Sequence, residues 1–413
     1  MLPPGQGTSR ALVASNQRRR LFAATIAAVS ERGYDETSVA DLVALSGVSR
    51  ATFYRHFSDK RDCFEAALEE MLRLAVERIR DRCDGVAGKG KAEAAVEELI
   101  HLVTWQRAAA RVCLVESYAA GNAARTALEA AVASFEELVA ETLADDRGTE
   151  PMPDGIVRAI VGGFYKILHS RLYSGTEAEL PGLAPALLVW MTGYCPPPHP
   201  LRAPRARLPA ASPPPFSGRD RPERILRALA AEVAANGYAG TKVADVAARA
   251  GVSLSTFYLH FEGKRDALMA ALDSSGAQML AAAIPAARRA PSWPLAVRAA
   301  LDSMCGFLAA EPDFAALRAV EVYAAGPEAM ALRDRAVSDL FQALFALPCE
   351  DPPRPDPLVL EAIAGSIYGL LYRQLRGSGA SAVPEIAPLL TYVSLAPLLG
   401  AERASEVANG PRR

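Results

Sequence analysis

TSVADLVALSGVSRATFYRHF, residues 37–57, is the most informative segment of this 413-residue chain. Apolar residues at helical spacing predict a short helix that starts at residue 39 and stops at Gly47, because glycine favours the end of a helix. Either Thr37 or Ser38 can cap its start. A second short helix is predicted over residues 50–56. Two short helices joined by a tight turn that contains glycine indicate a helix-turn-helix, and a helix over residues 17–32 supplies its packing surface.

The same segment occurs twice in the chain. Residues 21–68 align without a gap with residues 225–272, and 24 of the 48 paired positions are identical. Farther along, Glu116-Ser-Tyr118-Ala-Ala-Gly121 recurs as Glu321-Val-Tyr323-Ala-Ala-Gly326. A unit of about 200 residues is large enough to hold its own core. We therefore expect two complete domains of similar architecture rather than a solenoid.

Both copies show helical periodicity, and runs of alternating β-branched residues are missing from the sequence. Glycine and proline breaks predict about nine helices in each copy. The predicted fold class is all-α, with two tandem units, each a three-helix head followed by a helical domain. Nine prolines within residues 196–215 predict an extended, semi-rigid linker between the copies.

These signals divide the chain into seven segments. They are a flexible N-terminal arm (1–16), the first helix-turn-helix domain (17–64), a first helical regulatory domain (65–195), the proline-rich linker (196–218), the second helix-turn-helix domain (219–268), a second helical regulatory domain (269–402) and a flexible tail (403–413).

Composition excludes several classes of protein. The 45 basic and 47 acidic side chains leave a net charge of −2, which excludes a protein that is basic throughout. Residues 18–61 and residues 217–265 nevertheless each carry eight basic and five acidic side chains, so both helix-turn-helix segments are locally basic.

The six cysteines are widely spaced and form no Cys-x-x-Cys pair, which predicts free thiols in a reducing cytoplasm and no metal site. No cofactor is expected, because a glycine-rich phosphate loop is missing from the sequence. The charge-free stretch 180–201 contains prolines and only about ten residues of apolar helix. A membrane span needs about 20 such residues, so no membrane partner is expected.

The matched residues carry a resemblance to a known family. Copy one contains Thr37-Ser-Val39-Ala-Asp41, Gly47-Val-Ser49, Thr52-Phe-Tyr54-Arg-His56-Phe57 and Lys60-Arg61-Asp62, and copy two repeats this pattern as Thr241-Lys-Val243-Ala-Asp245, Gly251-Val-Ser253, Thr256-Phe-Tyr258-Leu-His260-Phe261 and Lys264-Arg265-Asp266. The pattern resembles the TetR family of bacterial transcriptional repressors. The resemblance implies a three-helix DNA-binding head and a larger domain for ligand binding and dimerisation.

The resemblance also implies roles for individual residues. The threonine before the first short helix caps it, residues at the start of the second read bases, and the following tyrosine, histidine and lysine hold phosphates. For Tyr54, His56 and Lys60, positions in the core, on a backbone group or in solvent remain alternatives. The predicted DNA-binding residues are Thr37, Ser49, Arg50, Ala51, Thr52, Tyr54, Arg55, His56 and Lys60 in copy one, and Thr241, Ser253, Ser255, Thr256, Tyr258, His260 and Lys264 in copy two.

The two copies differ where bases would be read. Arg50, Ala51 and Arg55 correspond to Leu254, Ser255 and Leu259. An arginine can bridge O6 and N7 of guanine, whereas a leucine contacts at best a thymine methyl group. We therefore predict that the two heads read different half-sites and that the second head contributes less affinity.

TetR-type proteins act as twofold dimers through their last two long helices. The matching segments here are residues 154–173 with 183–194, and residues 356–376 with 385–399. They contain small residues and a large apolar face, so they can approach closely and need burial. Our hypothesis is an intrachain pseudo-dimer that binds one operator with unlike halves. The alternative is a homodimer of chains that carries four heads.

The resemblance further implies a small apolar or amphipathic effector. Aromatic and polar residues at helical spacing are candidates for its pocket, and ordinary helix core is the alternative for each of them. The candidates are Trp105, Tyr118, Phe164, Tyr165, His169 and Trp190 in copy one, and Phe307, Phe314, Tyr323, Tyr368 and Tyr372 in copy two.

The leading functional hypothesis is a sequence-specific transcriptional regulator, a ligand-released repressor that binds a double-stranded DNA operator. The alternative is a ligand-binding or scaffold protein in which the head of copy two has lost DNA binding. An enzyme is disfavoured, because the sequence holds no Gly-x-Ser-x-Gly or His-Glu-x-x-His motif.

Overall fold

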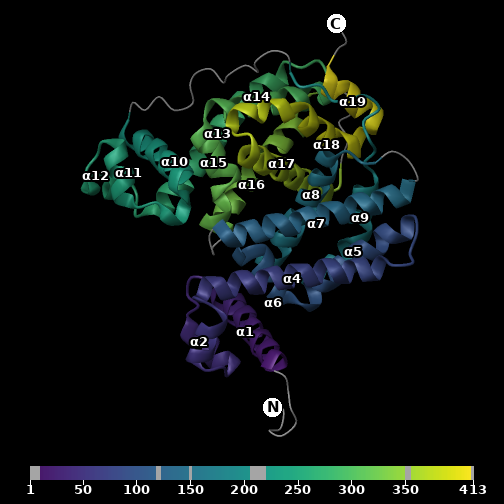
Figure 1. Cartoon of the computed structure of the whole chain (residues 1–413). Helices are drawn as coiled ribbons and strands as arrows, with labels where there is room; N and C mark the ends of the chain where they lie inside the picture. Colours follow the sequence, from purple (N-terminus) through teal and green to yellow (C-terminus); the bar gives the residue numbers. More distant parts are fainter. Residues whose placement is uncertain (1–9, 118–121, 148–150, 205–219, 349–354, 411–413) are drawn as a thin grey trace.

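The computed structural model describes residues 10–117, 122–147, 151–204, 220–348 and 355–410, and every regular element in these ranges is helical (Figure 1). Copy one comprises α1 (Arg10–Arg32), α2 (Val39–Ser46), α3 (Arg50–His56), α4 (Lys60–Cys83), α5 (Lys89–Trp105), α6 (Arg107–Arg111), the π-helical turn η1 (Val112–Glu116), α7 (Asn122–Arg147), α8 (Asp154–Ser174), the 3-10 turn η3 (Glu177–Glu179) and α9 (Leu180–Thr192).

Copy two repeats this order. It comprises α10 (Arg221–Gly240), α11 (Val243–Ala250), α12 (Leu254–His260), α13 (Lys264–Arg288), α14 (Trp293–Ala310), α15 (Pro312–Ala319), the 3-10 turn η4 (Glu321–Ala325), α16 (Pro327–Phe345), α17 (Pro357–Gly377), the 3-10 turn η5 (Ala380–Ile386), α18 (Ala387–Leu399) and α19 (Ala401–Asn409). The prediction of an all-α chain with two tandem units is confirmed.

Short-range hydrogen bonds fix the helix-turn-helix of copy one. The hydroxyl of Ser38 accepts the N–H of Asp41, and the Asp41 carboxylate accepts the N–H of Ser38, so the two residues form a capping box on α2. Gly47 ends α2 in the left-handed region, at φ 61°. Ser49 then caps α3 and accepts the N–H of Thr52 at 3.2 Å. Both short helices have the predicted limits.

The expectation that Thr37 and Thr241 cap the first short helices is wrong. Both side chains are buried, and each hydroxyl donates at 2.8 Å to the carbonyl of the glycine four residues earlier. Each threonine lies one residue too early in the chain, so its hydroxyl closes the turn after the preceding helix. Ser38 is the cap of α2, and Lys242 stands at the cap of α11 without a side-chain bond.

The heads differ in how they join the rest of the chain. In copy one, Phe53 and Phe57 pack in a small core of their own with Leu21 and Leu42. In copy two, the core around Phe257 and Phe261 continues into α15, η4 and α16. The prediction that these four phenylalanines are core residues is confirmed, and head two shares its core with its regulatory domain.

The two copies pack against each other inside the chain. Helix α8 of copy one lies along α17 of copy two, and glycines at the crossing let the two backbones approach (Figure 1). A Cβ atom on Gly162 would lie 2.8 Å from the carbonyl oxygen of Gly365. The Ser366 hydroxyl donates to the carbonyl of Ala159 at 2.6 Å, and the Tyr194 hydroxyl donates to that of Val393 at 2.8 Å.

One apolar core spans this contact. It includes Phe164 and Trp190 from copy one together with Ile363 and Tyr392 from copy two, all nearly inaccessible to solvent. The apolar faces of the late helices cover each other within one chain, and the two packed copies are called the pseudo-dimer below. The number of chains in the functional assembly stays a prediction.

Both predicted flexible ends are partly helical. Helix α1 begins at Arg10 rather than residue 17, because residues 10–16 contain no glycine or proline and include good helix formers. Helix α19 occupies most of the predicted tail, where Ala404, Val407 and Ala408 lie at helical spacing and are buried. Residues 1–9 and 411–413 lie outside the described ranges.

The linker prediction is only partly covered by the structure. Residues 196–204 contain no regular helix, and residues 205–219 lie outside the described ranges. Leu201 packs on the shared core, and the N–H of Arg202 donates to Oδ1 of Asn409 at 2.9 Å. The first part of the linker is therefore docked on the pseudo-dimer.

Two helical segments, Lys264–Arg288 and Ala380–Leu399, are long and apolar enough to cross a membrane by length and composition alone. In the folded chain, α13 packs against α14 and α16, while α18 packs against α14 and α19. Packing within the pseudo-dimer accounts for their apolar composition.

Candidate DNA-binding heads and effector cavity

Head one presents a basic surface on α3. Ser49, Arg50, Ala51, Tyr54 and Arg55 are exposed, as a role in reading DNA requires. The Arg50 guanidinium lies 5.9 Å from the centre of the Tyr54 ring, and Arg55 donates to the hydroxyl of Thr52 at 2.9 Å. Thr52 itself is buried, because its hydroxyl also accepts from Ser49 at the start of the helix.

His56 is half-buried and is held by the first helix. One ring nitrogen, Nε2, lies 3.0 Å from Oε1 of Gln17, so the two side chains form a hydrogen bond between α3 and α1. Burial lowers the pKa of His56, and the nearby Arg55 and Arg18 lower it further. At neutral pH the ring is therefore predominantly uncharged, and a phosphate contact would depend on an N–H donor rather than on a full positive charge.

Head two presents a different surface. Ser253, Ser255, Tyr258 and His260 are exposed on or next to α12, and Thr256 is half-buried. Two apolar side chains stand beside them in solvent, since Leu254 is 48% and Leu259 76% exposed. The surface offers hydroxyl groups and methyl groups where head one offers two arginines.

The two predicted phosphate-binding lysines point inward in this structure. Lys60 donates to the carbonyl of Tyr34 at 2.8 Å, and its ammonium lies 4.2 Å from the centre of that ring. Lys264 makes the same contacts with Tyr238, at 2.7 and 4.4 Å. Both ammonium groups therefore fasten the loop after the first helix of each head, and contact with phosphate remains a prediction.

Replacement of Arg50 by leucine is expected to relax base preference in one half of the operator only. A bidentate arginine–guanine contact contributes about 1–3 kcal/mol of discrimination, so selectivity at one base pair should fall about 10- to 100-fold. Competition binding with operators altered in either half measures the effect. The reciprocal variant Leu254→Arg is the matched control and should change the other half. An equal loss in both halves would contradict separate reading by the two heads.

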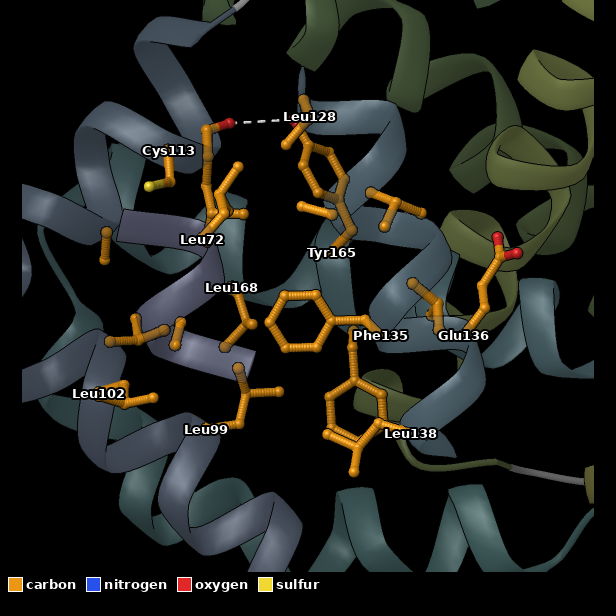
Figure 2. Close-up of a pocket in the computed structure, with 18 of the residues that line it drawn as sticks. Leu72, Leu99, Leu102, Cys113, Leu128, Phe135, Glu136, Leu138, Tyr165 and Leu168 are labelled. Carbon is orange, nitrogen blue, oxygen red and sulfur yellow. Dashed lines mark hydrogen bonds between the residues drawn. The ribbon is translucent and has the colours of Figure 1, made fainter. Parts of the chain in front are cut away.

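A cavity of about 690 Å³ lies in the regulatory domain of copy one, between α4, α5, α7 and α8 (Figure 2). Its wall is mostly apolar, with Leu72, Leu99 and Phe135 directed inward and Tyr165 near one end. The Tyr165 hydroxyl donates to the carbonyl of Leu114 at 2.9 Å. The volume and the apolar wall suit a small organic ligand.

Five of the candidate ligand residues line this cavity, and three of these belong to copy two. Phe164 and Tyr165 contribute from α8, while Tyr323, Tyr368 and Tyr372 reach it across the copy interface. Sequence reasoning missed the aliphatic and charged lining residues on α4, α5 and α7. Their helical spacing is that of ordinary core, so nothing in the sequence separates them from it.

The remaining candidates lie elsewhere. Trp105 is 79% exposed at the end of α5, because the helix ends there and turns the ring into solvent. His169 packs between Tyr165 and Tyr173. Trp190, Phe307 and Phe314 are core residues, and Tyr118 lies outside the described residues.

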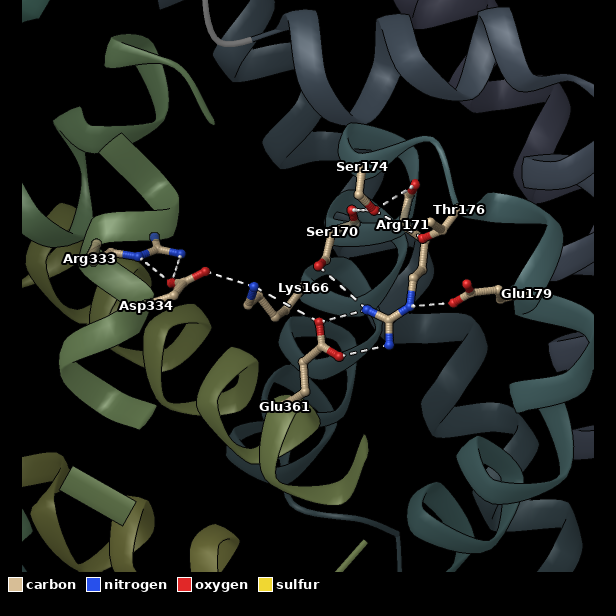
Figure 3. A network of polar contacts seen from close by, with 9 residues as sticks. All are labelled: Lys166, Ser170, Arg171, Ser174, Thr176, Glu179, Arg333, Asp334 and Glu361. Carbon is tan, nitrogen blue, oxygen red and sulfur yellow. Dashed lines mark hydrogen bonds and ion pairs between the residues drawn. The ribbon is translucent and has the colours of Figure 1, made fainter. Parts of the chain in front are cut away.

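Charged residues connect the copies beside the cavity (Figure 3). Asp334 of α16 accepts from Arg333 on its own helix and from Lys166 of α8, whose ammonium lies 2.7 Å away. Arg171 of α8 pairs with both carboxylate oxygens of Glu361 on α17, at 2.9 and 3.0 Å. These ion pairs fix α8 of copy one against the helices of copy two.

A repeated glutamate joins each head to its regulatory domain, with different strength in the two copies. Glu321 accepts the N–H of Tyr238 at 3.1 Å and pairs at 3.2 Å with Arg125, a buried residue of copy one. Its counterpart Glu116 accepts the N–H of Tyr34 at 3.4 Å and pairs with Arg111 at 3.7 Å. Head two is therefore anchored to both copies.

Acidification is expected to destabilise the protein partly through His169. Burial lowers the pKa of this imidazole to about 4, and the positive charges of Lys166 and Arg333 act in the same direction. The stabilising contribution of the neutral ring is complete above the unfolded pKa of about 6.5 and falls as pH drops toward 4.

Protonation of His169 is expected to lower the free energy of unfolding by about 2 kcal/mol between pH 7 and pH 5. Urea unfolding at several pH values gives the free energy of unfolding of the wild-type chain and of His169→Gln. The difference between the two values should change by this amount between pH 7 and pH 5. Two parallel stability profiles would show that this histidine does not titrate as expected.

Within the part of the chain that the structure describes, no group of three or more histidine, cysteine, aspartate or glutamate side chains is placed to hold a metal ion. Cys63, Cys83, Cys113 and Cys305 are buried free thiols, and Cys195 is an exposed one. Cys349 lies outside the described residues.

Comparisons with known proteins match the heads. Residues 21–67 and 225–272 match the family model described as "Bacterial regulatory proteins, tetR family". The chain is similar to the uncharacterized HTH-type transcriptional regulator YvdT of Bacillus subtilis (strain 168), with 32% identity over 71 residues. That alignment covers 17% of this chain and 37% of YvdT, so the chain matches about a third of this relative's length.

Solved structures with a similar fold include two regulators named FadR. The fatty acid degradation regulator FadR from Bacillus halodurans is 17% identical, with a TM-score of 0.40, and the alignment covers 43% of this chain and 95% of that one. FadR from Bacillus subtilis in complex with stearoyl-CoA is also 17% identical, with a TM-score of 0.39 and coverage of 42% and 97%.

Proposed function

Because this chain belongs to the TetR family of bacterial regulatory proteins and carries two tandem copies of the family's head, we propose that it is a sequence-specific transcriptional regulator. It binds a double-stranded DNA operator and acts as a repressor that a small ligand releases. The single observation that carries the proposal is the pair of helix-turn-helix heads mounted on one intrachain pseudo-dimer. Two heads on one pair of packed copies can bind two half-sites together.

The heads are unlike, so the operator is quasi-palindromic with unlike halves. Arg50 and Arg55 suit a half-site that contains guanine, whereas Leu254 and Leu259 suit one with exposed thymine methyl groups. Each chain supplies both heads, and the apolar faces of α8 and α17 are already covered within it. The functional unit is therefore one chain, with a mass of 43.8 kDa.

Selection of DNA fragments by the purified protein, followed by footprinting, tests this function. We expect a protected site with two dissimilar halves about one helical turn apart. Light scattering of the complex should give one chain for each operator, and a mass of two chains would instead support the homodimer with four heads. Failure of folded protein to enrich any sequence would refute the repressor function.

The exposed leucines of head two favour a second candidate function, in which only head one binds DNA and copy two serves as a scaffold. Salt dependence distinguishes the two candidates. Each phosphate contact contributes about 0.9 to the slope of log affinity against log salt concentration. If both heads bind DNA, log affinity should fall more steeply with log salt concentration on the full operator than on the half-site of head one. Equal slopes on the two DNAs would support the scaffold function of copy two.

The effector of the proposed repressor is a small apolar or amphipathic molecule that occupies the cavity of copy one. The cavity reaches α7, and α7 also carries Arg125, which pairs with Glu321 at the base of head two. A ligand that shifts α7 would therefore move a residue that anchors a head.

A further inference from the structure

The cavity of copy one has a repeat-related counterpart in copy two that is closed. The counterpart is a void of about 10 Å³, compared with about 690 Å³ in copy one. Its wall includes Met279, Arg318 and Tyr368. At offsets of 203–205 residues, these correspond to Ala75, Cys113 and Tyr165, all of which line the open cavity. The same site is thus open in one copy and filled in the other.

Arg318 is the residue that fills the second site. It is 2% exposed, and its Nη1 donates to the carbonyl of Leu272 at 2.5 Å and to the Ser275 hydroxyl at 3.0 Å. Room for it comes from Gly276, where a Cβ atom would lie 3.2 Å from Nη1. The positions that correspond to Arg318 and Gly276 in copy one are Cys113 and Leu72, so the filling depends on a matched pair of substitutions between the copies.

Copy two also completes the open cavity. Tyr323, Tyr372 and Arg333 of copy two line it, and the Tyr323 ring packs edge-on against Tyr165 of copy one at 6.2 Å. One copy alone would leave this end of the cavity without a wall. The ligand site is therefore composite, built from both halves of the chain.

Charged side chains of both signs gather at the composite end. Among the cavity-lining residues there, Arg158, Lys166, Arg333 and Arg373 face two carboxylates, Glu129 and Glu136. Three more carboxylates pair with these cations: Asp334 with Lys166 and Arg333, Glu361 with Lys166, and Asp154 with Arg158. The individual donors, rather than the sum of charges, therefore decide what the end can bind.

Arg333 lines the cavity and carries one buried donor without a partner in the part of the chain that the structure describes. The residue is 1% exposed, its guanidinium lies 4.0 Å from the centre of the Tyr368 ring, and Nε and Nη2 bind Asp334. Its Nη1 has no hydrogen-bond partner among the described residues. A buried unpaired donor is costly and is relieved by an acceptor.

We propose that each chain binds a single effector, an apolar molecule with one acidic group. Its apolar body occupies the cavity of copy one, its acidic group lies against Arg333 of copy two, and copy two binds no effector of its own. This inference rests on the proposed function only where it names the occupant an effector, because the site itself is defined without DNA.

A matched pair of fluorescent probes tests the site in the full chain without DNA. 1-Anilinonaphthalene-8-sulfonate is apolar with one acidic group, and N-phenyl-1-naphthylamine has the same rings without that group. Titration should give one saturable site per chain, with the sulfonate bound about tenfold more tightly. Operator footprinting is independent of these titrations, so a failed DNA experiment and a failed ligand experiment are distinguishable.

Variants at repeat-related positions locate the site. Ala75→Phe should fill the cavity and lower the affinity for both probes at least tenfold, with Val132→Phe as a second filling variant in case the first does not fold. Met279→Leu, at the position in copy two that corresponds to Ala75, is the matched control and should leave both affinities unchanged. Circular dichroism establishes that each variant is folded.

Arg333→Met should lower the affinity for the sulfonate about tenfold and leave the affinity for the neutral probe unchanged. Arg373→Met removes a more exposed cation from the same end of the cavity and serves as the second variant. Two equivalent sites per chain, or a site that neither filling variant affects, would overturn the single composite site. Equal affinity for the two probes in the wild-type chain would overturn the requirement for an acidic group.

Discussion

A valine in place of Gly365 is expected to separate the two copies and to lower operator affinity about 100-fold. A Cβ atom at this position would lie 2.5 Å from Cβ of Lys166, 2.6 Å from the carbonyl oxygen of Gly162 and 2.9 Å from Cα of Gly163. Two of these atoms belong to the backbone of α8, so no side-chain rotation relieves the clash. The helices must move apart, and the core between them opens.

The affinity falls because the heads lose their fixed separation. On the intact pseudo-dimer, binding by one head places the other at its half-site, which raises avidity about 10²- to 10⁴-fold over one head. After separation only the linker connects the copies, so the lower end of this range is the expected loss. Fluorescence anisotropy with the selected operator measures it, and small-angle scattering should show a more extended chain.

Gly377→Val is the matched control for Gly365→Val. Gly377 lies at the end of the same helix, and a Cβ atom there would have no atom within 4 Å. This variant should bind the operator as the wild-type chain does. If Gly365→Val retained wild-type affinity and dimensions, the α8–α17 contact could not be what positions the heads.

Removal of the Glu321 carboxylate is expected to destabilise the chain by about 3–5 kcal/mol. In Glu321→Ala the N–H of Tyr238 loses its acceptor, and Arg125, 6% exposed, loses its counter-charge. Removal of one partner from a buried ion pair has effects of this size because the remaining charge is left without compensation. Urea unfolding followed by circular dichroism measures the loss.

Glu116→Ala is the control that the repeat provides. The Glu116 contacts are longer, and its partner Arg111 is about one-third exposed, so water compensates for much of the loss. We expect about 1 kcal/mol there. Addition of Arg125→Met to Glu321→Ala should recover part of the stability, since Met330 already occupies the corresponding position in copy two. A larger effect at Glu116 than at Glu321 would contradict the stronger anchoring of head two.

In the proposed regulator, the asymmetry between the copies gives each copy a different role. Copy one carries the arginine-rich head and the open cavity, while copy two carries a head with exposed leucines and a filled site. Copy two nevertheless supplies Arg333 to the cavity and receives Arg125 at the base of its head. Both contacts cross the interface between the copies, so a ligand in the cavity of copy one can act on head two directly.

Local sequence signals were sufficient for the heads and for the tandem order. The limits of α2 and α3 follow from Ser38, Gly47 and Ser49, whose effects depend on hydrogen bonds to residues at most four positions away. The repeat likewise requires only comparison of the chain with itself. Short-range signals left Thr37 and Ser38 as alternative caps of α2, because a difference of one residue decides which turn a hydroxyl closes.

The cavity and the inward lysines were decided by tertiary structure. Tyr323 and Tyr372 belong to copy two but line the cavity of copy one. Lys60 bonds to a carbonyl 26 residues earlier. Arg318 fills a volume that exists only when α13 and α15 are packed together.

Local sequence patterns were therefore enough to predict the helical elements, the two heads and the residues that differ between the heads. Which copy keeps an open cavity, and which residues of the other copy complete it, was decided only by packing. The two kinds of feature differ in the sequence separation of the residues that interact. Caps and turns depend on bonds within one helical turn, whereas a cavity is the space left when side chains about 200 positions apart meet across α8 and α17.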